Sequence, residues 1–144
     1  MGTDAVRRVV TGSDASGRSF FASDGPAPAR GPYVSDVWGS ESVVQLPSDG
    51  RSPGVAATFP SAGGFRFSVV RFAAGRDVAL HRSDTIDYGV VLSGEIWLEV
   101  DGGSETLLRP GDTVVQCGAR HGWHNRSAEP CAMAFALVGA APEA

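Results

Sequence analysis

Three residues in the second half of the chain have the chemistry for proton transfer or metal binding. They are His81, Asp87 and His121. Imidazole and carboxylate are the usual proton-transfer groups near neutral pH, and two imidazoles with one carboxylate can also hold a non-haem iron. Asp87 lies in an apolar run, and strand alternation predicts that its side chain faces inward. A buried carboxylate is unfavourable unless it is paired or ligates something, so we expect a histidine, a metal or both beside it.

Other side chains are candidates for substrate contact. Trp123 shares the strand face of the second histidine and is predicted to form a pocket wall. Arg71 and Arg120 have the chemistry to bind a substrate carboxylate bidentately, although a solvated arginine is the more common outcome. Tyr88 and Trp97 are further candidates, although such aromatic residues are more often found in a core or a dimer interface.

Two more residues have side chains that could ligate a metal or act as a nucleophile, but their positions in the sequence argue against these roles. His124 alternates with His121 along a predicted strand, so we expect it to point to the opposite face, as a surface histidine, unless the strand is bulged. Cys117 lies in a turn near the second histidine and has no activating neighbour in the sequence, so it is predicted to be an inert thiol.

The turn formers and short apolar runs indicate an all-β chain. Nineteen glycines and nine prolines are spread over 144 residues, and no segment shows a helical period. From residue 65 onward, residues alternate as in a strand with one face turned inward. Short strands separated by turns every eight to twelve residues are typical of a sandwich or barrel. The predicted strands of this region are 65–70, 86–92, 95–100, 106–108, 113–116, 121–126 and 131–138.

The first part of the chain is less regular. Residues 7–11 and 18–23 are predicted to form a hairpin, and residues 33–38 another strand. Between them, the proline-rich segment 24–32 is predicted to block regular structure, because proline lacks the donor that a sheet requires. Residues 47–64 form a long irregular stretch, for which the alternatives are a lid over the pocket and a solvated connection.

The two histidine-bearing segments resemble the motifs of the cupin family. Gly75-x5-His81-x-Ser83-x3-Asp87-x6-Gly94 has the spacing of the first cupin motif, and Gly111-x6-Gly118-x2-His121-x3-Asn125 resembles the second. The resemblance covers residues 65–138 and implies a cupin-type jelly-roll β-barrel, commonly dimeric, with a pocket at one end. We expect a single structural domain, in which residues 1–64 add strands and an irregular N-terminal arm and residues 139–144 form a tail.

The chain departs from the family in its ligand set. In cupins, two histidines and a glutamate of the first motif join the histidine of the second to hold a divalent metal. Here Asp87 replaces the glutamate, and Ser83 replaces the second histidine. Serine is a poor ligand for a transition metal. The resemblance thus implies either a three-ligand site for Fe, Mn, Ni or Zn, formed by His81, Asp87 and His121, or an acid–base set with no metal.

Three functions fit these residues. The leading hypothesis is a small-molecule enzyme of secondary metabolism, a lyase or isomerase such as a dehydratase, decarboxylase or cyclase, acting on an oxygenated organic acid or a polyketide-like metabolite. In it His81 or His121 transfers a proton and Asp87 orients the imidazole. The alternatives are an Fe(II)-dependent dioxygenase with a two-histidine, one-carboxylate site and a non-catalytic ligand-binding cupin.

Composition restricts the partners. A net charge of −4 gives no electrostatic reason to expect nucleic acid or an anionic membrane as partner. The chain shows no N-terminal apolar signal and no run of about 18 apolar residues. The two cysteines are too few for a disulfide framework. We therefore expect a cytoplasmic protein with free thiols and a small-molecule substrate, and the family resemblance implies a homodimer.

Overall fold

The computed structural model describes residues 5–54 and 57–141, and within these residues the chain is nearly all β-structure. The all-β prediction is confirmed. The strands are β1 (Arg7–Ser13), β2 (Ser19–Pro26), β3 (Ala29–Arg30), β4 (Val34–Ser40), β5 (Phe65–Phe72), β6 (Asp77–His81), β7 (Thr85–Ser93), β8 (Ile96–Val100), β9 (Glu105–Leu108), β10 (Thr113–Cys117), β11 (His121–His124) and β12 (Cys131–Gly139), with a 3-10 turn at Asp101–Gly103.

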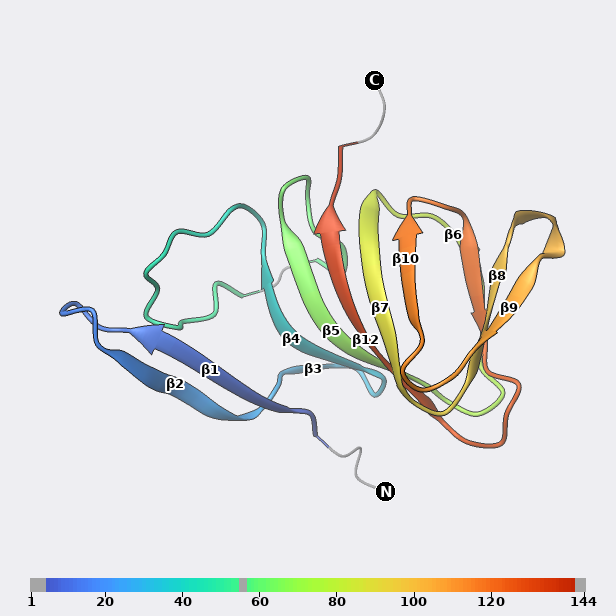
Figure 1. Cartoon of the computed structure of the whole chain (residues 1–144), viewed down its shortest axis with the longest axis horizontal. Helices are drawn as coiled ribbons and strands as arrows, with labels where there is room; N and C mark the ends of the chain where they lie inside the picture. Colours follow the sequence, from blue (N-terminus) through green and yellow to red (C-terminus); the bar gives the residue numbers. More distant parts are fainter. Residues whose placement is uncertain (1–4, 55–56, 142–144) are drawn as a thin grey trace.

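Two sheets form the body of the molecule. The larger has the order β10-β7-β12-β5-β4-β3, and the smaller has the order β6-β11-β8-β9. Figure 1 shows the smaller sheet curving round to face the larger one. Their inner faces enclose a core that includes Phe72, Trp123, Met133 and Phe135. Every strand pairing among the described residues is antiparallel, and most of these pairings join strands that are not consecutive in the chain.

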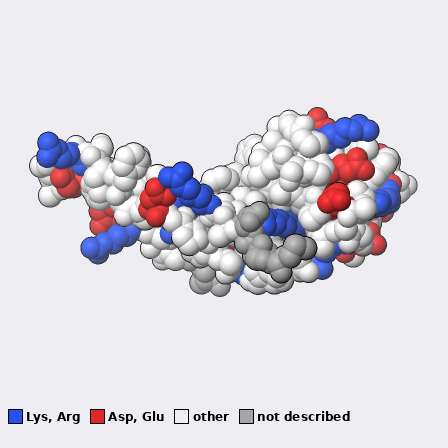
Figure 2. Space-filling view, turned by 90° about the horizontal axis from the view of Figure 1, so that it is seen from below, with Lys and Arg blue, Asp and Glu red and all other residues white. Residues whose placement is uncertain are grey.

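The predicted N-terminal hairpin is present. Strands β1 and β2 pair antiparallel, and the ion pair between Arg7 and Asp24 joins them on the surface. The hairpin extends away from the body at the narrow end of the molecule (Figures 1 and 2). The face drawn in Figure 2 carries charges of both signs.

Two segments are more regular than predicted. Within the proline-rich stretch, β2 continues to Pro26 and β3 forms at Ala29–Arg30, at the edge of the larger sheet, where a proline need not donate a hydrogen bond. Strand β6 was not predicted from the sequence, although it carries His81. It contains polar residues and is short, so its pairing with β11 defines it as a strand more than its own pattern does.

On β5 the more polar of the two faces points inward. Arg66 and Ser68 are buried, whereas Phe67 is 42% exposed. Arg66 forms an ion pair with Glu41 and donates to the carbonyls of Ser40 and Ala57. The buried guanidinium thus ties the irregular segment that follows β4 to the barrel. Whether this segment closes over the cavity as a lid remains a prediction.

No helix long and apolar enough to cross a bilayer occurs in the residues that the structure describes.

Candidate functional site

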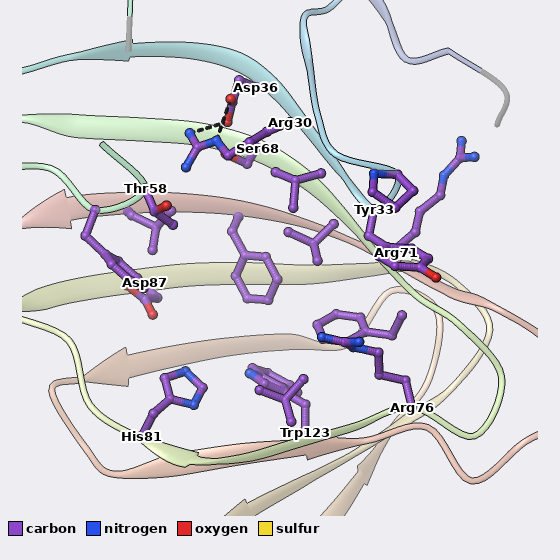
Figure 3. A pocket seen from close by; sticks show the side chains of 18 of the residues that line it. Arg30, Tyr33, Asp36, Thr58, Ser68, Arg71, Arg76, His81, Asp87 and Trp123 are labelled. Carbon is purple, nitrogen blue, oxygen red and sulfur yellow. Dashed lines mark hydrogen bonds and ion pairs between the residues drawn. The ribbon is translucent and has the colours of Figure 1, made fainter. Parts of the chain in front are cut away.

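The predicted site residues meet in one cavity between the two sheets. It has a volume of about 460 Å³, and His81, Asp87, His121 and Trp123 all line it. Figure 3 places Asp87 and His81 at one end of this cavity, with Trp123 beside them. The prediction that Asp87 faces inward is confirmed, since it is 6% exposed. Most of the remaining wall is apolar and consists of Val34, Phe59, Val70, Phe72, Val78, Phe135 and Leu137.

The two histidines lie side by side because of a bulge. His81 on β6 is the register partner of His121 on β11, and their ring centroids are 4.5 Å apart. Between this pair and the next, Trp123 with Val78, β6 has one residue more than β11. The extra residue brings His81 onto the face of Val78, which simple alternation would not do. At Gly122 a Cβ would lie 2.7 Å from the carbonyl oxygen of Val78, so glycine permits this close approach.

Both histidines have the same tautomer. Each Nδ1 lies 2.8 Å from a backbone carbonyl oxygen, that of Ala79 for His81 and that of Ala119 for His121. A carbonyl oxygen can only accept, so each Nδ1 carries the proton and donates it. In the neutral imidazole, Nε2 then carries the lone pair, with which it can accept a proton or ligate a metal.

Asp87 is held by a short chain of hydroxyl groups. The Thr85 hydroxyl donates to Asp87 Oδ1 at 2.6 Å, and its oxygen lies 2.7 Å from Ser83 Oγ. Because Thr85 donates its only proton to the carboxylate, Ser83 donates to Thr85. Ser83, at the position of the missing histidine ligand, thus supports the carboxylate through Thr85. Neither hydroxyl was predicted from the sequence to act in the site, although Thr85 and Asp87 share one face of β7 by alternation.

A buried amide beside Asp87 was also missed. Gln116 on β10 is the register partner of Asp87 on β7, so the two side chains are cross-strand neighbours. Gln116 is 4% exposed, and its Nε2 has no hydrogen-bond partner among the described residues. An unpaired buried donor is unfavourable. Its place next to a buried carboxylate adds a polar group to this end of the site.

The side chains of His81, Asp87 and His121 are of the types that bind a divalent metal. Two imidazole Nε2 atoms and a carboxylate are a known ligand set, and metal-bound histidines commonly donate their other nitrogen to a carbonyl. The ligand atoms of His81, Asp87 and His121 do not all lie within 4.8 Å of one another, and Thr85 restrains the carboxylate. A single ion bound by all three residues therefore requires a side chain to move.

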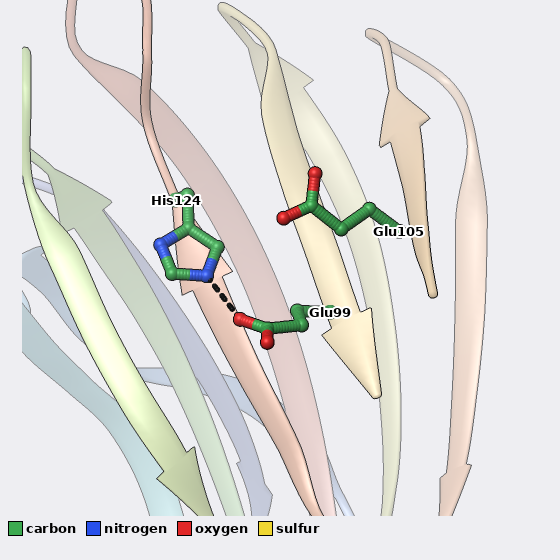
Figure 4. Close-up of side chains that lie close together, drawn as sticks. All are labelled: Glu99, Glu105 and His124. Carbon is green, nitrogen blue, oxygen red and sulfur yellow. Dashed lines mark hydrogen bonds and ion pairs between the residues drawn. The ribbon is translucent and has the colours of Figure 1, made fainter. Parts of the chain in front are cut away.

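A second polar cluster lies on the outer face of the smaller sheet. Ligand atoms of Glu99, Glu105 and His124 are within 4.8 Å of one another (Figure 4). These groups already have partners: His124 Nε2 is 2.6 Å from Glu99, His124 Nδ1 is 2.7 Å from Asp77, and Glu105 forms two hydrogen bonds with Arg126. The outer cluster can thus form a satisfied ion-pair network without a metal.

His124 points away from His121, as predicted, but it is not a surface histidine. Its side chain is only 16% exposed, because Asp77 and Glu99 enclose it from the two neighbouring strands. The hydrogen bond to Glu99, and then that to Asp77, raise the pKa of His124 above its ordinary value. Both carboxylates stabilise the imidazolium form, so this histidine is predisposed to hold a proton.

Three arginines line the cavity, and Arg76 lies at the end opposite His81 (Figure 3). Arg30 donates both ends of its guanidinium to Asp36, at 2.8 and 2.9 Å, so its charge is compensated. The Arg76 guanidinium lies 5.7 Å from the centre of the Tyr33 ring. In Figure 3 Arg76 reaches toward the cavity from below Tyr33, whereas the Arg71 side chain extends away from it. Arg71, which was predicted as a substrate contact, is among the residues that line the cavity. Arg76 also lines it, and it was not predicted from the sequence.

Two aromatic candidates lie outside the cavity. Tyr88 follows Asp87 on β7 and so points to the other face of the sheet, where it is 49% exposed. Trp97 lies between the inward-facing Ile96 and Leu98, and the Arg126 guanidinium is 5.3 Å from its ring centre on the outer face. Strand alternation turns both side chains away from this cavity. Neither lines it, so neither is placed to contact a substrate bound there.

Arg120 also lies elsewhere. It is an exposed residue and forms an ion pair with Asp101 at 3.1 Å. It does not line the cavity. Cys117 is exposed, and Cys131 is buried in the core, where burial raises the pKa of its thiol to about 11. Neither thiol lines the cavity.

Comparisons with known proteins agree with this architecture. The model of the cupin domain matches residues 68–138. The cupin-domain-containing oxidoreductase fogC of Aspergillus ruber is 30% identical over 150 residues, covering 95% of this chain and 74% of that protein. The structure of an uncharacterised protein with a double-stranded β-helix domain from Klebsiella pneumoniae superposes with a TM-score of 0.54 at 22% identity, over 77% of this chain and 80% of that one. The chain belongs to the cupin family, and its two sheets are the halves of a cupin barrel.

Other relatives match only in part. Phomopsin biosynthesis cluster protein C' of Diaporthe leptostromiformis is 46% identical over 65 residues, which is 45% of this chain and 34% of that protein. Oryzines biosynthesis cluster protein J of Aspergillus oryzae is 41% identical over 76 residues, or 53% of this chain and 42% of that protein. The match therefore spans less than half the length of these curated relatives.

Proposed function

We propose that this cupin is a small-molecule enzyme of secondary metabolism that transfers a proton at carbon or oxygen, as a lyase or isomerase does. The observation that carries the proposal is the common tautomer of His81 and His121. In the neutral imidazoles both Nε2 lone pairs are available in one largely apolar cavity, with a buried carboxylate on the facing sheet. The names of the relatives from phomopsin and oryzines biosynthesis clusters support a role in secondary metabolism.

The residues of the chain divide the work of proton transfer. One Nε2 accepts a proton from the substrate, while the backbone carbonyl stabilises the positive charge that develops on that imidazole. Asp87 provides a fixed negative charge from the facing sheet, and Thr85 holds its orientation. The rings of His121 and Trp123 are nearly perpendicular, with centres 5.9 Å apart, and Trp123 and the other apolar lining residues surround the reacting end.

A second candidate is an oxidoreductase. It is supported by the name of the relative from Aspergillus ruber, whose match covers most of both chains. His81, His121 and Asp87 would hold the metal, after a side-chain movement that brings the three ligand atoms together. A redox-active divalent metal there would supply one-electron and oxygen chemistry. The chain's own residues would hold the metal and position the substrate against it.

One experiment separates the two candidates. The protein is purified anaerobically with its metal content measured, and is then incubated in D2O with a panel of aryl-substituted 3-hydroxy and 4-oxo carboxylic acids. Deuterium incorporation is followed by NMR and oxygen consumption with an electrode. Exchange or elimination that is lost in His81→Gln and His121→Gln, without oxygen uptake, supports proton transfer. Stoichiometric iron with oxygen uptake supports the oxidoreductase. Activity that survives in both variants contradicts both candidates.

A further inference from the structure

The charges in the cavity are separated along its length. Asp87 and the histidines occupy one end, and Arg76 and Tyr33 lie at the other (Figure 3). Among the described residues no carboxylate forms an ion pair with Arg76. The face of Tyr33 is its neighbour, at 5.7 Å, which leaves the planar edge of the guanidinium able to donate two hydrogen bonds.

Strand β6 sets the distance between the two ends. Arg76 directly precedes this strand, and His81 ends it five residues further on. At the rise of an extended strand, their Cα atoms are about 16 Å apart. Arg76 and Val78 share one face by alternation, and the bulge brings His81 onto that face as well. A ligand that contacts both residues must therefore be elongated.

The middle of the cavity is apolar. Between the two ends lie Phe72, Trp123 and Phe135, whose rings contact one another with centres 5.8 to 5.9 Å apart. Arg30 and Asp36 also line the cavity, but they compensate each other and offer no net charge to a ligand. A volume of about 460 Å³ holds a ligand of two or more fused or linked rings.

We propose that the cavity binds an elongated, largely apolar monocarboxylate, with its carboxylate at Arg76 and its reacting atoms at His81 and His121. The inference rests on the proposed function and deepens it, since it names the substrate class of the same cavity. Short polar acids are excluded as good ligands because they cannot reach both ends. A neutral ligand of the same shape loses the contact with Arg76.

The test compares an acid with its amide. Dissociation constants are measured by titration calorimetry for biphenyl-4-carboxylic acid, biphenyl-4-carboxamide and the short acid propionate. The proteins are the wild type, Arg76→Gln and the control Arg120→Gln, which alters an arginine outside the cavity. In the wild type and the control the biphenyl acid binds about tenfold or more tightly than the amide. In Arg76→Gln the two affinities become similar, and propionate binds weakly to all three proteins.

Equal affinity of acid and amide in the wild type overturns the inference, as does an acid preference that persists in Arg76→Gln. Thermal unfolding of both variants confirms that each is folded. Binding at equilibrium does not depend on turnover. Arg76-dependent binding of an acid that is never turned over contradicts the proposed function alone. Histidine-dependent exchange with a substrate whose affinity is unaffected by Arg76→Gln contradicts this inference alone.

Discussion

His121 and His124 are three residues apart on the same strand, yet their surroundings are opposite in kind. In His121, as in His81, the Nδ1–H group donates a hydrogen bond to a neutral backbone carbonyl, and the ring faces the cavity. His124 lies on the outer face, and each of its ring nitrogens is hydrogen-bonded to a carboxylate. The three imidazoles therefore form an inner pair and an outer histidine within one small sheet.

The difference shows that the partners of an imidazole decide its role. A neutral carbonyl fixes the tautomer without adding charge, so the inner pair can exchange protons or bind a ligand. Two carboxylates stabilise the imidazolium and occupy both nitrogens, so His124 serves to join β6, β11 and β8. The inner pair is thus distinguished from His124 more by the ring nitrogen that faces the cavity than by burial.

The largest expected effect separates the inner pair from the outer histidine in catalysis. His81→Gln and His121→Gln should each lower kcat/KM by about 100-fold or more, because the proton-accepting nitrogen is removed. His124→Gln, the matched control from the other face of β11, should leave kcat/KM little changed. A loss of similar size in all three variants, with folding intact, would abolish the distinction between the two groups.

The hydroxyl chain that holds Asp87 gives the next largest effect. Thr85→Val keeps the shape of the side chain and removes the donor to Asp87 Oδ1. We expect the free energy of unfolding to fall by about 1–3 kcal/mol, because a buried carboxylate loses its partner, and kcat/KM to fall with it. Thr85→Ser should restore most of both. Denaturant unfolding and steady-state kinetics test this, and an unchanged Thr85→Val protein contradicts it.

The outer histidine should matter for stability. At pH 6, His124→Gln should lower the free energy of unfolding by about 1 kcal/mol. The contact with Glu99 accounts for most of this, because Asp77 is 72% exposed and solvent screens its charge. Urea unfolding measures the change. A similar loss in Asp77→Asn alone would show that the exposed carboxylate is the main partner instead.

The smallest effect is the pH dependence of that contribution. The folded protein holds the His124 proton more tightly than the unfolded chain, since its pKa is raised. The stabilisation is therefore complete below about pH 6.5 and is lost as the pH rises through the raised pKa. The difference in unfolding free energy between wild type and His124→Gln should shrink over that window. A difference that grows with pH would show that the neutral imidazole is the favoured form.

Much of this could be predicted from the sequence because it depends on local spacing. The period of two along β7 correctly placed Asp87 inward, and along β11 it correctly directed His124 away from His121. The same period should have placed Tyr88 and Trp97 outside the cavity, as the structure does. Their selection as substrate contacts followed residue type instead of the strand face.

What the sequence determined by itself is therefore the fold class, the two histidine segments and the direction of side chains within a regular strand, since each is set by neighbours in the chain. Tertiary structure alone decided the rest. The extra residue of β6 and the close approach at Gly122 bring His81 beside His121. Strand pairing places Glu99 and Asp77 around His124 and sets Arg76 opposite the histidines. These contacts join residues far apart in the chain, and their energies depend on which strands meet.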